Sequence, residues 1–534
     1  MDGEAWWGEA RLGPWLEKSR WVTLPGIGIC LALPPLLGFG NFSYVPVAGL
    51  VGLLAVSFAL AEDRQIRGVF VGLWALSLFV VLAVFLLVFG VSRAVGGPFF
   101  GPDSAKFLNA SLYLAREHFH LGAHPIQVFG SSEVGHYYLY ALLIKAFHAD
   151  VFAIQLFNCG ITAIFGPLIF AAGRFIVPRF ALLVGAIVGL NPELMMLAAR
   201  DLLKDPSVTL TMTAAIWALV RVWRADSVRT RVANAAFAFL MVTYLRMGRF
   251  YVELYLAVAV AAVLLLVAIR RRPAVAAARA IAAAAISVFV STEIAMVGLG
   301  WPSAPWLMYS QIQHVRKTAR MAYYDPGLFD GGTTARSVPP SPAREASGRP
   351  PTPAAAGEAV AVPVFVVPPA RPSAPAVAAE RTSRVAVPQW AAWITNGIRR
   401  LYGPFIWIVP DRWDLREILT ADYLLYPGML IWYAVLPLAV VGLLLTLWRT
   451  LRGREESLPL MALCFFTAVY FIQYLAINLS YRQRATMFPV VLLFGFVGLS
   501  AALRVGTWKR WYASYWAALA LAAVTHLAVR ALDR

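Results

Sequence analysis

The sequence predicts an all-α, polytopic integral membrane protein with about 13 transmembrane helices. Of the 534 residues, 60% are hydrophobic and only 14% are charged, whereas about a quarter of the residues in a soluble domain carry a charge. The apolar residues are grouped in long blocks, and about 20 such residues cross a hydrocarbon core of roughly 30 Å. These blocks must form helices, because lipid offers no hydrogen-bond partner to an open backbone group.

The expected spans follow the apolar blocks along the chain. A further apolar segment, 135–148, is short and carries His136, Lys145 and His148. We interpret it as a half-inserted or interfacial helix, because ionisable side chains are rare inside a full span. The spans are expected near 22–40, 44–61, 68–91, 150–172, 180–197, 206–222, 232–245, 250–269, 279–298, 428–448, 458–477, 487–504 and 512–530.

Basic residues between the spans predict the orientation of the chain. With these spans, every basic cluster falls on one side of the membrane, which we expect to be cytoplasmic. Counting 135–148 as a full span would break this agreement. We therefore expect a multi-pass protein of the plasma (inner) membrane. The clusters begin with Lys18 and Arg20, Arg64 and Arg67, and Arg174 and Arg179, and continue with Arg221 to Arg231, Arg270 to Arg272, Arg449 to Arg454, and Arg504 to Arg510.

The formal net charge of +18 is explained by these clusters. The sequence has no zinc knuckle and no basic stripe with interleaved aromatics, so nucleic acid is not an expected partner. The expected partner is instead the lipid bilayer. Cys30, Cys159 and Cys464 lie inside apolar blocks and predict buried thiols. The histidines His118, His120 and His124 would lie on different faces of a helix end, so we assign no metal to them.

Five regions follow from the span pattern. An N-terminal three-span segment covers 1–91, and an outer loop covers 92–149. In that loop Ala105, Leu108, Leu112, Ala115 and Phe119 recur at steps of three and four, which predicts an amphipathic helix on the membrane surface. A transmembrane core (150–299), a second outer loop (300–427) and the C-terminal helices (428–534) complete the chain. Within the second loop, 331–388 is rich in Pro and Ala and predicts a disordered linker.

Several cations are expected on the outer face, where the positive-inside rule disfavours them. An anionic ligand such as a lipid phosphate would explain their presence, because guanidinium groups bind phosphate through two parallel hydrogen bonds. Two alternatives remain open. Interfacial salt bridges with Asp201 and Asp205 would neutralise some of the cations, and snorkelling would place others at the interface. The candidate phosphate-binding residues are Arg200, Lys204, Arg246, Arg249, Arg482 and Arg484.

Acidic residues on the same face supply candidates for proton transfer. Asp103 follows Gly101 and Pro102 and precedes the expected surface helix. Its carboxylate can deprotonate a hydroxyl or amine, hold a divalent cation, or simply cap the helix. Two acids lie in or beside spans. Glu293 has no assignable partner, and Glu253 is placed to pair with Arg249 at i,i+4.

Three segments, in order, resemble the GT-C superfamily of polytopic glycosyltransferases, which includes protein mannosyltransferases and undecaprenyl-phosphate-sugar transferases. The likeness covers roughly 95–250 well and 400–500 loosely. This sequence departs from the usual family pattern in two features. The acidic loop follows the third span instead of the first, and its motif is Asp-Ser instead of Asp-Glu or Glu-Asp. The second departure leaves Glu133 as an alternative base. The segments are Gly101-Pro102-Asp103 to Ala110, Leu190-Asn191-Pro192-Glu193 to Asp205, and Tyr481-Arg482-Gln483-Arg484 to Pro489.

This resemblance implies a GT-C-like core and an enzyme that transfers a sugar, with inversion, from a polyprenyl-phosphate donor. The acceptor would be a glycan, lipid or protein on the periplasmic or extracellular face. Asp103, or Glu133, would be the base, and the six cations above would hold the phosphate. One alternative is a polymerase or ligase of lipid-linked glycans that uses a pyrophosphate donor. Another is a transporter or flippase, although such proteins place charges near the midplane and show matching halves.

Overall fold

The computed structural model describes most of the helical parts of the chain. The predicted linker, 331–388, and His118, His120 and His124 lie outside the described residues. Within the described residues, every regular element is a helix. The described ranges are 7–36, 43–94, 102–116, 134–200, 202, 204–225, 227–270, 275–307, 309–310, 313, 401–402, 426–452, 458–477 and 481–532.

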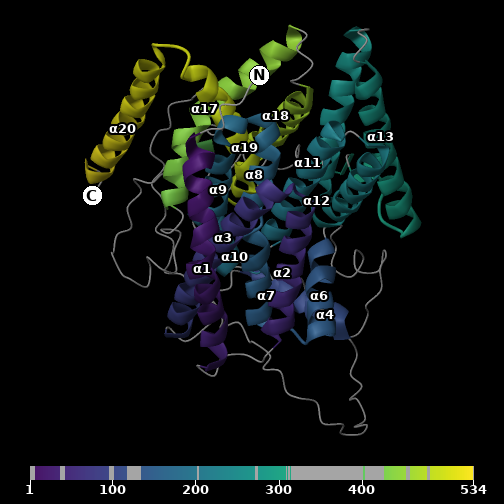
Figure 1. Cartoon of the computed structure of the whole chain (residues 1–534), viewed down its shortest axis with the longest axis vertical. Helices are drawn as coiled ribbons and strands as arrows, with labels where there is room; N and C mark the ends of the chain where they lie inside the picture. The colour runs from purple at the N-terminus through teal and green to yellow at the C-terminus, as the bar shows by residue number, and fades with distance from the viewer. Residues whose placement is uncertain are drawn as a thin grey trace, which may run out of the picture.

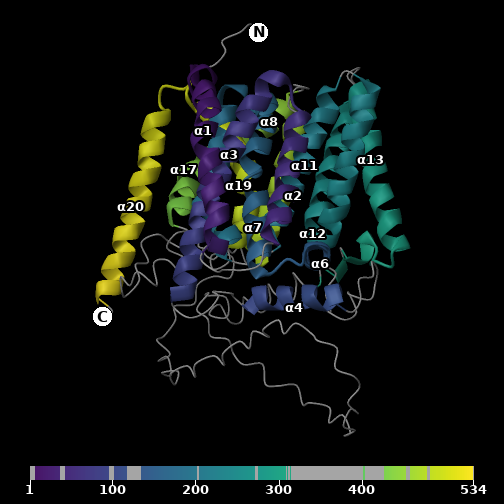
Figure 2. The same ribbon diagram turned by 60° about the horizontal axis from the view of Figure 1, so that its bottom comes forward.

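The helices form one elongated bundle, with α13 and α20 at opposite outer edges in both views (Figures 1 and 2). The predicted all-α fold is therefore confirmed for the described part of the chain. In order, the elements are α1 (Trp7–Leu36), α2 (Tyr44–Leu60), α3 (Arg64–Ala94), α4 (Pro102–Arg116), α6 (Gly135–Phe147), α7 (Val151–Thr162), α8 (Phe165–Ile176), η1 (Pro178–Phe180), α9 (Ala181–Gly189), α10 (Pro192–Arg200), α11 (Asp205–Arg224), α12 (Val228–Arg270), α13 (Val275–Gly298), α17 (Tyr426–Leu451), α18 (Leu458–Ile477), α19 (Tyr481–Ala502) and α20 (Trp508–Leu532).

The bundle has the surface of a membrane protein. Apolar side chains such as Leu53, Ile294 and Leu521 are 65%, 69% and 68% exposed, which suits lipid better than water. Among the described residues, five helical stretches are long and apolar enough to cross a membrane. They are Ile66–Val88, Val151–Ile176, Pro178–Ala199, Pro427–Leu451 and Gln483–Ala502.

The centre of the bundle is built around the stretch formed by α7 and α8, which other helices enclose. Helix α8 packs closely against α9. A Cβ atom on Gly166 would lie 2.6 Å from the carbonyl oxygen of Gly185, so this approach needs glycine, as close helix contacts in membranes often do. Cys159 and Cys464 are buried as predicted, whereas Cys30 is only half-buried.

Helix α4 lies across one end of the bundle, beside α6, whereas most other helices run along its length (Figure 2). It occupies the position at which the sequence predicts an amphipathic helix. Its buried positions include Phe107, Leu108 and Leu114, and it packs against α6. Helix α6 has 13 residues, a length of about 20 Å that falls short of a hydrocarbon core.

Helix α12 breaks at Arg249, whose φ of −158° and ψ of 75° are not helical. The two spans expected at 232–245 and 250–269 therefore correspond to two halves of α12, and the first half begins earlier than predicted, at Val228. The break changes the direction of the side chains that follow it. It also places Arg246 and Arg249 where α12 meets neighbouring helices.

Candidate functional site

Three arginines are buried where helices begin or break at one end of the bundle. Arg246 and Arg249 lie at the break in α12, and Arg484 lies in the first turn of α19. Their exposed fractions are 0%, 2% and 1%. A buried guanidinium group must be paired, and each of the three has at least one carboxylate partner. We call these arginines and their acidic partners the arginine cluster.

Arg246 binds two carboxylates. One terminal nitrogen lies 2.9 Å from Glu253 Oε2, and the other lies 2.9 Å from Glu293 Oε2 and 3.0 Å from the carbonyl oxygen of Pro302. Glu293 also accepts a hydrogen bond from the backbone N–H of Ala304 at 2.7 Å. These contacts tie both halves of α12 to α13 and to the segment that follows it.

The expected pairing of Glu253 with Arg249 is wrong. Glu253 instead bonds to Arg246, seven residues away. The i,i+4 rule holds only along a continuous helix, and Arg249 itself departs from helical geometry. Glu293, for which the sequence offered no partner, also finds one in Arg246.

Arg249 joins α12 to two other helices. Its NH2 group lies 2.6 Å from Asp205 Oδ1, and its NH1 group donates to Thr486 Oγ1 at 3.3 Å. Asp205 is the first residue of α11 and precedes Pro206, and Lys204 takes the N-cap position. The predicted supporting role of Asp205 therefore takes a specific form, because this carboxylate holds a buried guanidinium group.

Arg484 joins α19 to α10 and α17. Its NH2 group donates to Glu193 Oε1 at 2.9 Å and to Met429 Sδ at 2.6 Å. Its guanidinium carbon lies 5.4 Å from the ring centre of Trp432. Glu193 is 1% exposed and stands in the first turn of α10, where a negative charge also suits the helix dipole.

The arginine cluster is therefore compensated and does not present bare cations. Three guanidinium groups face four carboxylates, so a formal negative charge remains. That Arg246, Arg249 and Arg484 hold a phosphate stays a prediction, and their guanidinium groups already bind carboxylates. In the geometry described, an anion would have to displace a carboxylate or use donors beyond those pairs.

The remaining candidate cations belong to the same end of the bundle. Lys204 is half-buried and directly precedes α11, and its carbonyl oxygen accepts from the hydroxyl of Ser207 at 2.8 Å. Arg200 is the last residue of α10, and Arg482 is the second residue of α19. The side chains of Arg200 and Arg482 are not described, and Asp201 lies outside the described residues.

Asp103 lies in the first turn of α4, one residue past Pro102, so it is inside the helix and not at the cap that the sequence suggested. Its side chain is not described, and Glu133 lies outside the described residues. The neighbouring Ser104 is fully buried, and its Oγ accepts a hydrogen bond from the backbone N–H of Leu202 at 3.1 Å. This bond fixes the start of α4 against the turn between α10 and α11.

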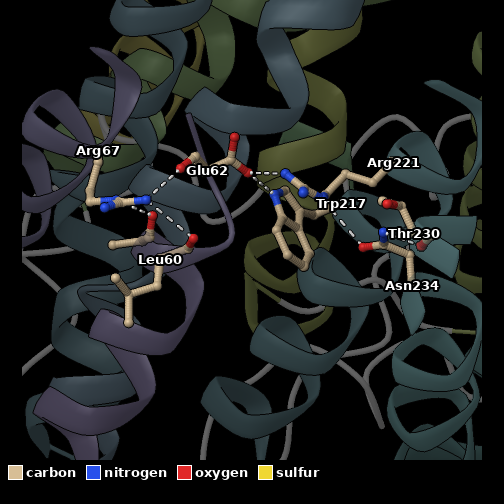
Figure 3. Close-up of polar contacts among 8 residues, drawn as sticks. Leu60, Glu62, Arg67, Trp217, Arg221, Thr230 and Asn234 are labelled. Carbon is tan, nitrogen blue, oxygen red and sulfur yellow. Dashed lines mark hydrogen bonds and ion pairs between the residues drawn. The ribbon is translucent and has the colours of Figure 1, made fainter. Parts of the chain in front are cut away.

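A second buried polar cluster lies at the opposite end of α11 from Asp205 (Figure 3). Glu62, between α2 and α3, accepts from Trp217 Nε1 at 2.8 Å and from Arg221 NH1 at 2.9 Å. Arg221 Nε also donates to Asn234 Oδ1 at 3.3 Å. These residues form an interhelical clamp. Arg221 belongs to one of the basic clusters predicted from the sequence, whereas Glu62 and Trp217 were not among the candidate residues.

Comparisons with known proteins assign no family to the chain: no protein-family model matches it, and no curated protein matches it significantly. The GT-C resemblance consequently depends on its three motif segments. Two bonds connect these segments, one from Leu202 to Ser104 and one from Arg484 to Glu193. Residues from all three segments therefore meet at one end of the bundle.

Proposed function

We propose that this chain is a GT-C-type membrane glycosyltransferase that uses a polyprenyl-phosphate-linked sugar. The observation that carries the proposal is the convergence of the three motif segments. The bond from Leu202 to Ser104 joins the first to the second, and the ion pair of Arg484 with Glu193 joins the second to the third. These bonds join residues 98 and 291 positions apart along the chain, so segments that resemble the family in sequence also lie together in the fold.

The proposal includes about 13 spans, with the arginine cluster on the periplasmic or extracellular side of the plasma membrane. Two features support this topology. Helix α4 crosses the end of the bundle (Figure 2), as a helix lying at a membrane interface would. Arg67 and Arg221, from two of the basic clusters, belong to the region of the Glu62 clamp, at the end of α11 opposite Asp205.

In the proposed reaction, an acceptor hydroxyl or amine attacks the anomeric carbon of the donor sugar. The bond between that carbon and the phosphate oxygen breaks, and its electron pair leaves with the lipid phosphate. Asp103, or Glu133 in its place, takes the proton of the acceptor. A glycan, lipid or protein supplies the acceptor, and a divalent cation is compatible with Asp103. The anomeric configuration is inverted.

Lys204, Arg200 and Arg482 are the first candidates to bind the leaving phosphate, because they lie in the second and third motif segments, where α10 ends and α11 and α19 begin. Their charge would be most useful when the phosphate leaves, since positive groups stabilise charge that develops in the transition state. Arg246, Arg249 and Arg484 would shape this region through their carboxylate partners. They would contact the phosphate only if a carboxylate gave way.

The proposal is tested with the purified full-length protein in lipid nanodiscs. The protein is given a polyprenyl-monophosphate-linked sugar or a pyrophosphate-linked oligosaccharide, together with a mixture of glycan, lipid and peptide acceptors. Sugar transfer from the monophosphate donor supports the proposal. Transfer only from the pyrophosphate donor supports a polymerase or ligase. Movement of intact donor between leaflets without loss of the sugar supports a flippase.

A further inference from the structure

Two buried polar atoms at the start of α10 have no hydrogen-bond partner within the described part of the molecule: Asn191 Nδ2 and Glu193 Oε2. Asn191 is 0% exposed and Glu193 is 1% exposed. Native proteins leave few buried polar atoms unsatisfied, and each exception calls for an explanation. The pair is more specific than either atom alone, because one atom is a donor and the other an acceptor.

The hydrogen bond made by the other atom of the same side-chain group shows which atom of Asn191 and of Glu193 is left unpaired. Asn191 Oδ1 accepts from the backbone N–H of Leu194 at 3.1 Å, so its amide nitrogen must be the remaining atom. Glu193 Oε1 accepts from Arg484 at 2.9 Å, which leaves Oε2 as an acceptor. Both residues lie against Gly428 of α17. A Cβ atom on Gly428 would come within 2.8 Å of Glu193 Cβ and 3.5 Å of Asn191 Oδ1.

The chemistry of the pair selects its ligand. A hydroxyl group both accepts and donates a hydrogen bond, so one hydroxyl can accept from Asn191 and donate to Glu193. A phosphate or carboxylate would accept from Asn191 but would be repelled by Glu193. An ammonium group would suit Glu193 but would leave the amide N–H of Asn191 without an acceptor.

We propose that Asn191 and Glu193 bind a sugar hydroxyl of the lipid-linked donor. This inference rests on the proposed function and names the part of the substrate that these residues recognise. Arg484, bonded to Glu193, lies next to the pair. A sugar held there would therefore lie at the end of the bundle where Lys204, Arg200 and Arg482 are proposed to bind the phosphate attached to that sugar.

The experiment compares two probes on the full-length protein in nanodiscs: undecaprenyl phosphate and undecaprenyl phosphate that carries a hexose. The measured quantity is the ratio of their Kd values, because the lipid and the phosphate are common to both probes. In the unaltered protein the hexose-bearing lipid is expected to bind about tenfold or more tightly, the effect of one charge-assisted hydrogen bond. Glu193→Gln and Asn191→Asp are each expected to bring the ratio close to one.

The double variant Asn191→Asp with Glu193→Gln is the decisive comparison, because it exchanges the donor and the acceptor. Glu193→Gln turns the acceptor into a donor, and Asn191→Asp turns the donor into an acceptor, while Leu194 and Arg484 keep an oxygen to bond. A hydroxyl tolerates this reversal, so the preference for the hexose-bearing lipid returns to within about threefold of its original value. Glu62→Gln, an equal change of a buried carboxylate in the distant clamp, is the matched control and keeps the full preference.

Each result bears on a different claim. Failure of the unaltered protein to bind either lipid would overturn the proposed function and this inference with it. Equal binding of both lipids would leave the anion site standing and reject the hydroxyl pair. A preference that survives in both single variants, or that the double variant does not restore, would also reject the pair. Loss of folding is detected separately from the unfolding temperature and lowers binding of both probes, so it does not imitate a change in their ratio.

Discussion

Arg484 of α19 donates a hydrogen bond to Glu193 of α10 over 2.9 Å, although 291 residues separate them along the chain. Both side chains are 1% exposed. A pair this deeply buried has lost its water, so either partner left alone would cost far more than the pair contributes. The relationship links the second and third motif segments and makes the position of each depend on the other.

Removing one member of this pair should therefore destabilise the fold strongly. We expect Glu193→Ala to lower the free energy of unfolding by about 3–5 kcal/mol, because it leaves the Arg484 guanidinium buried without its carboxylate. The double variant Glu193→Ala with Arg484→Met should lose less than the single variant. Reversible denaturation in mixed micelles measures both. A double variant that is less stable than Glu193→Ala would contradict this account.

The acid at the start of α4 provides the test of catalysis. Asp103→Asn should lower kcat by ~10²–10⁴ if the carboxylate accepts the proton of the acceptor. Asp150→Asn is the matched control, because Asp150 caps α7 by accepting from the N–H of Ala153, and asparagine caps equally well. Full turnover of Asp103→Asn together with loss of turnover in Glu133→Gln would transfer the role of base to Glu133.

Much of the fold follows from the sequence because lipid imposes a simple rule. Long apolar blocks had to become helices, and the described part of the chain is helical at these blocks. The short helix α6 and the crosswise helix α4 also stand where the polar pattern placed them. The count of about 13 spans and the orientation stay predictions.

The site was less accessible to sequence reasoning. The span pattern predicts that the candidate arginines share one face, but it does not identify their partners, because the carboxylates lie up to 291 residues away. The sequence does place Glu193 at the start of a helix, because an acid in the first turn after Asn-Pro is typical of a helix N-terminus. The pairing of Glu253 with Arg246 could not be read from spacing, because it depends on the break at Arg249.

Arg246 should not tolerate replacement by lysine. Its two terminal nitrogens serve two carboxylates and a carbonyl oxygen in different directions, and one ammonium group cannot reproduce that fork. We expect Arg246→Lys to cost about 1.5–3 kcal/mol of stability, the value of one hydrogen bond to a charged group. The change is measured by denaturation, with Arg229→Lys in the first turn of α12 as the control. Unaltered stability of Arg246→Lys would show that one carboxylate suffices.

The Glu62 clamp allows stability to be separated from activity. Trp217→Phe removes the N–H that donates to Glu62 over 2.8 Å. It keeps an aromatic ring beside Phe58 and Phe237, which contact Trp217 edge to face in the unaltered protein. We expect a loss of about 1–3 kcal/mol, because the lost bond is to a carboxylate. Arg221 should continue to hold Glu62, which limits the loss.

Transfer activity at a temperature well below unfolding should be unchanged in Trp217→Phe, because the clamp lies toward the end of α11 opposite Asp205. Glu62→Ala removes the acceptor of both Trp217 and Arg221, so it should be less stable than Trp217→Phe. Measuring unfolding and turnover on the same preparations separates the two effects. If Trp217→Phe lowered turnover without lowering stability, α11 would have to carry the disturbance to Asp205 and Arg249, and a purely structural role for the clamp would be rejected.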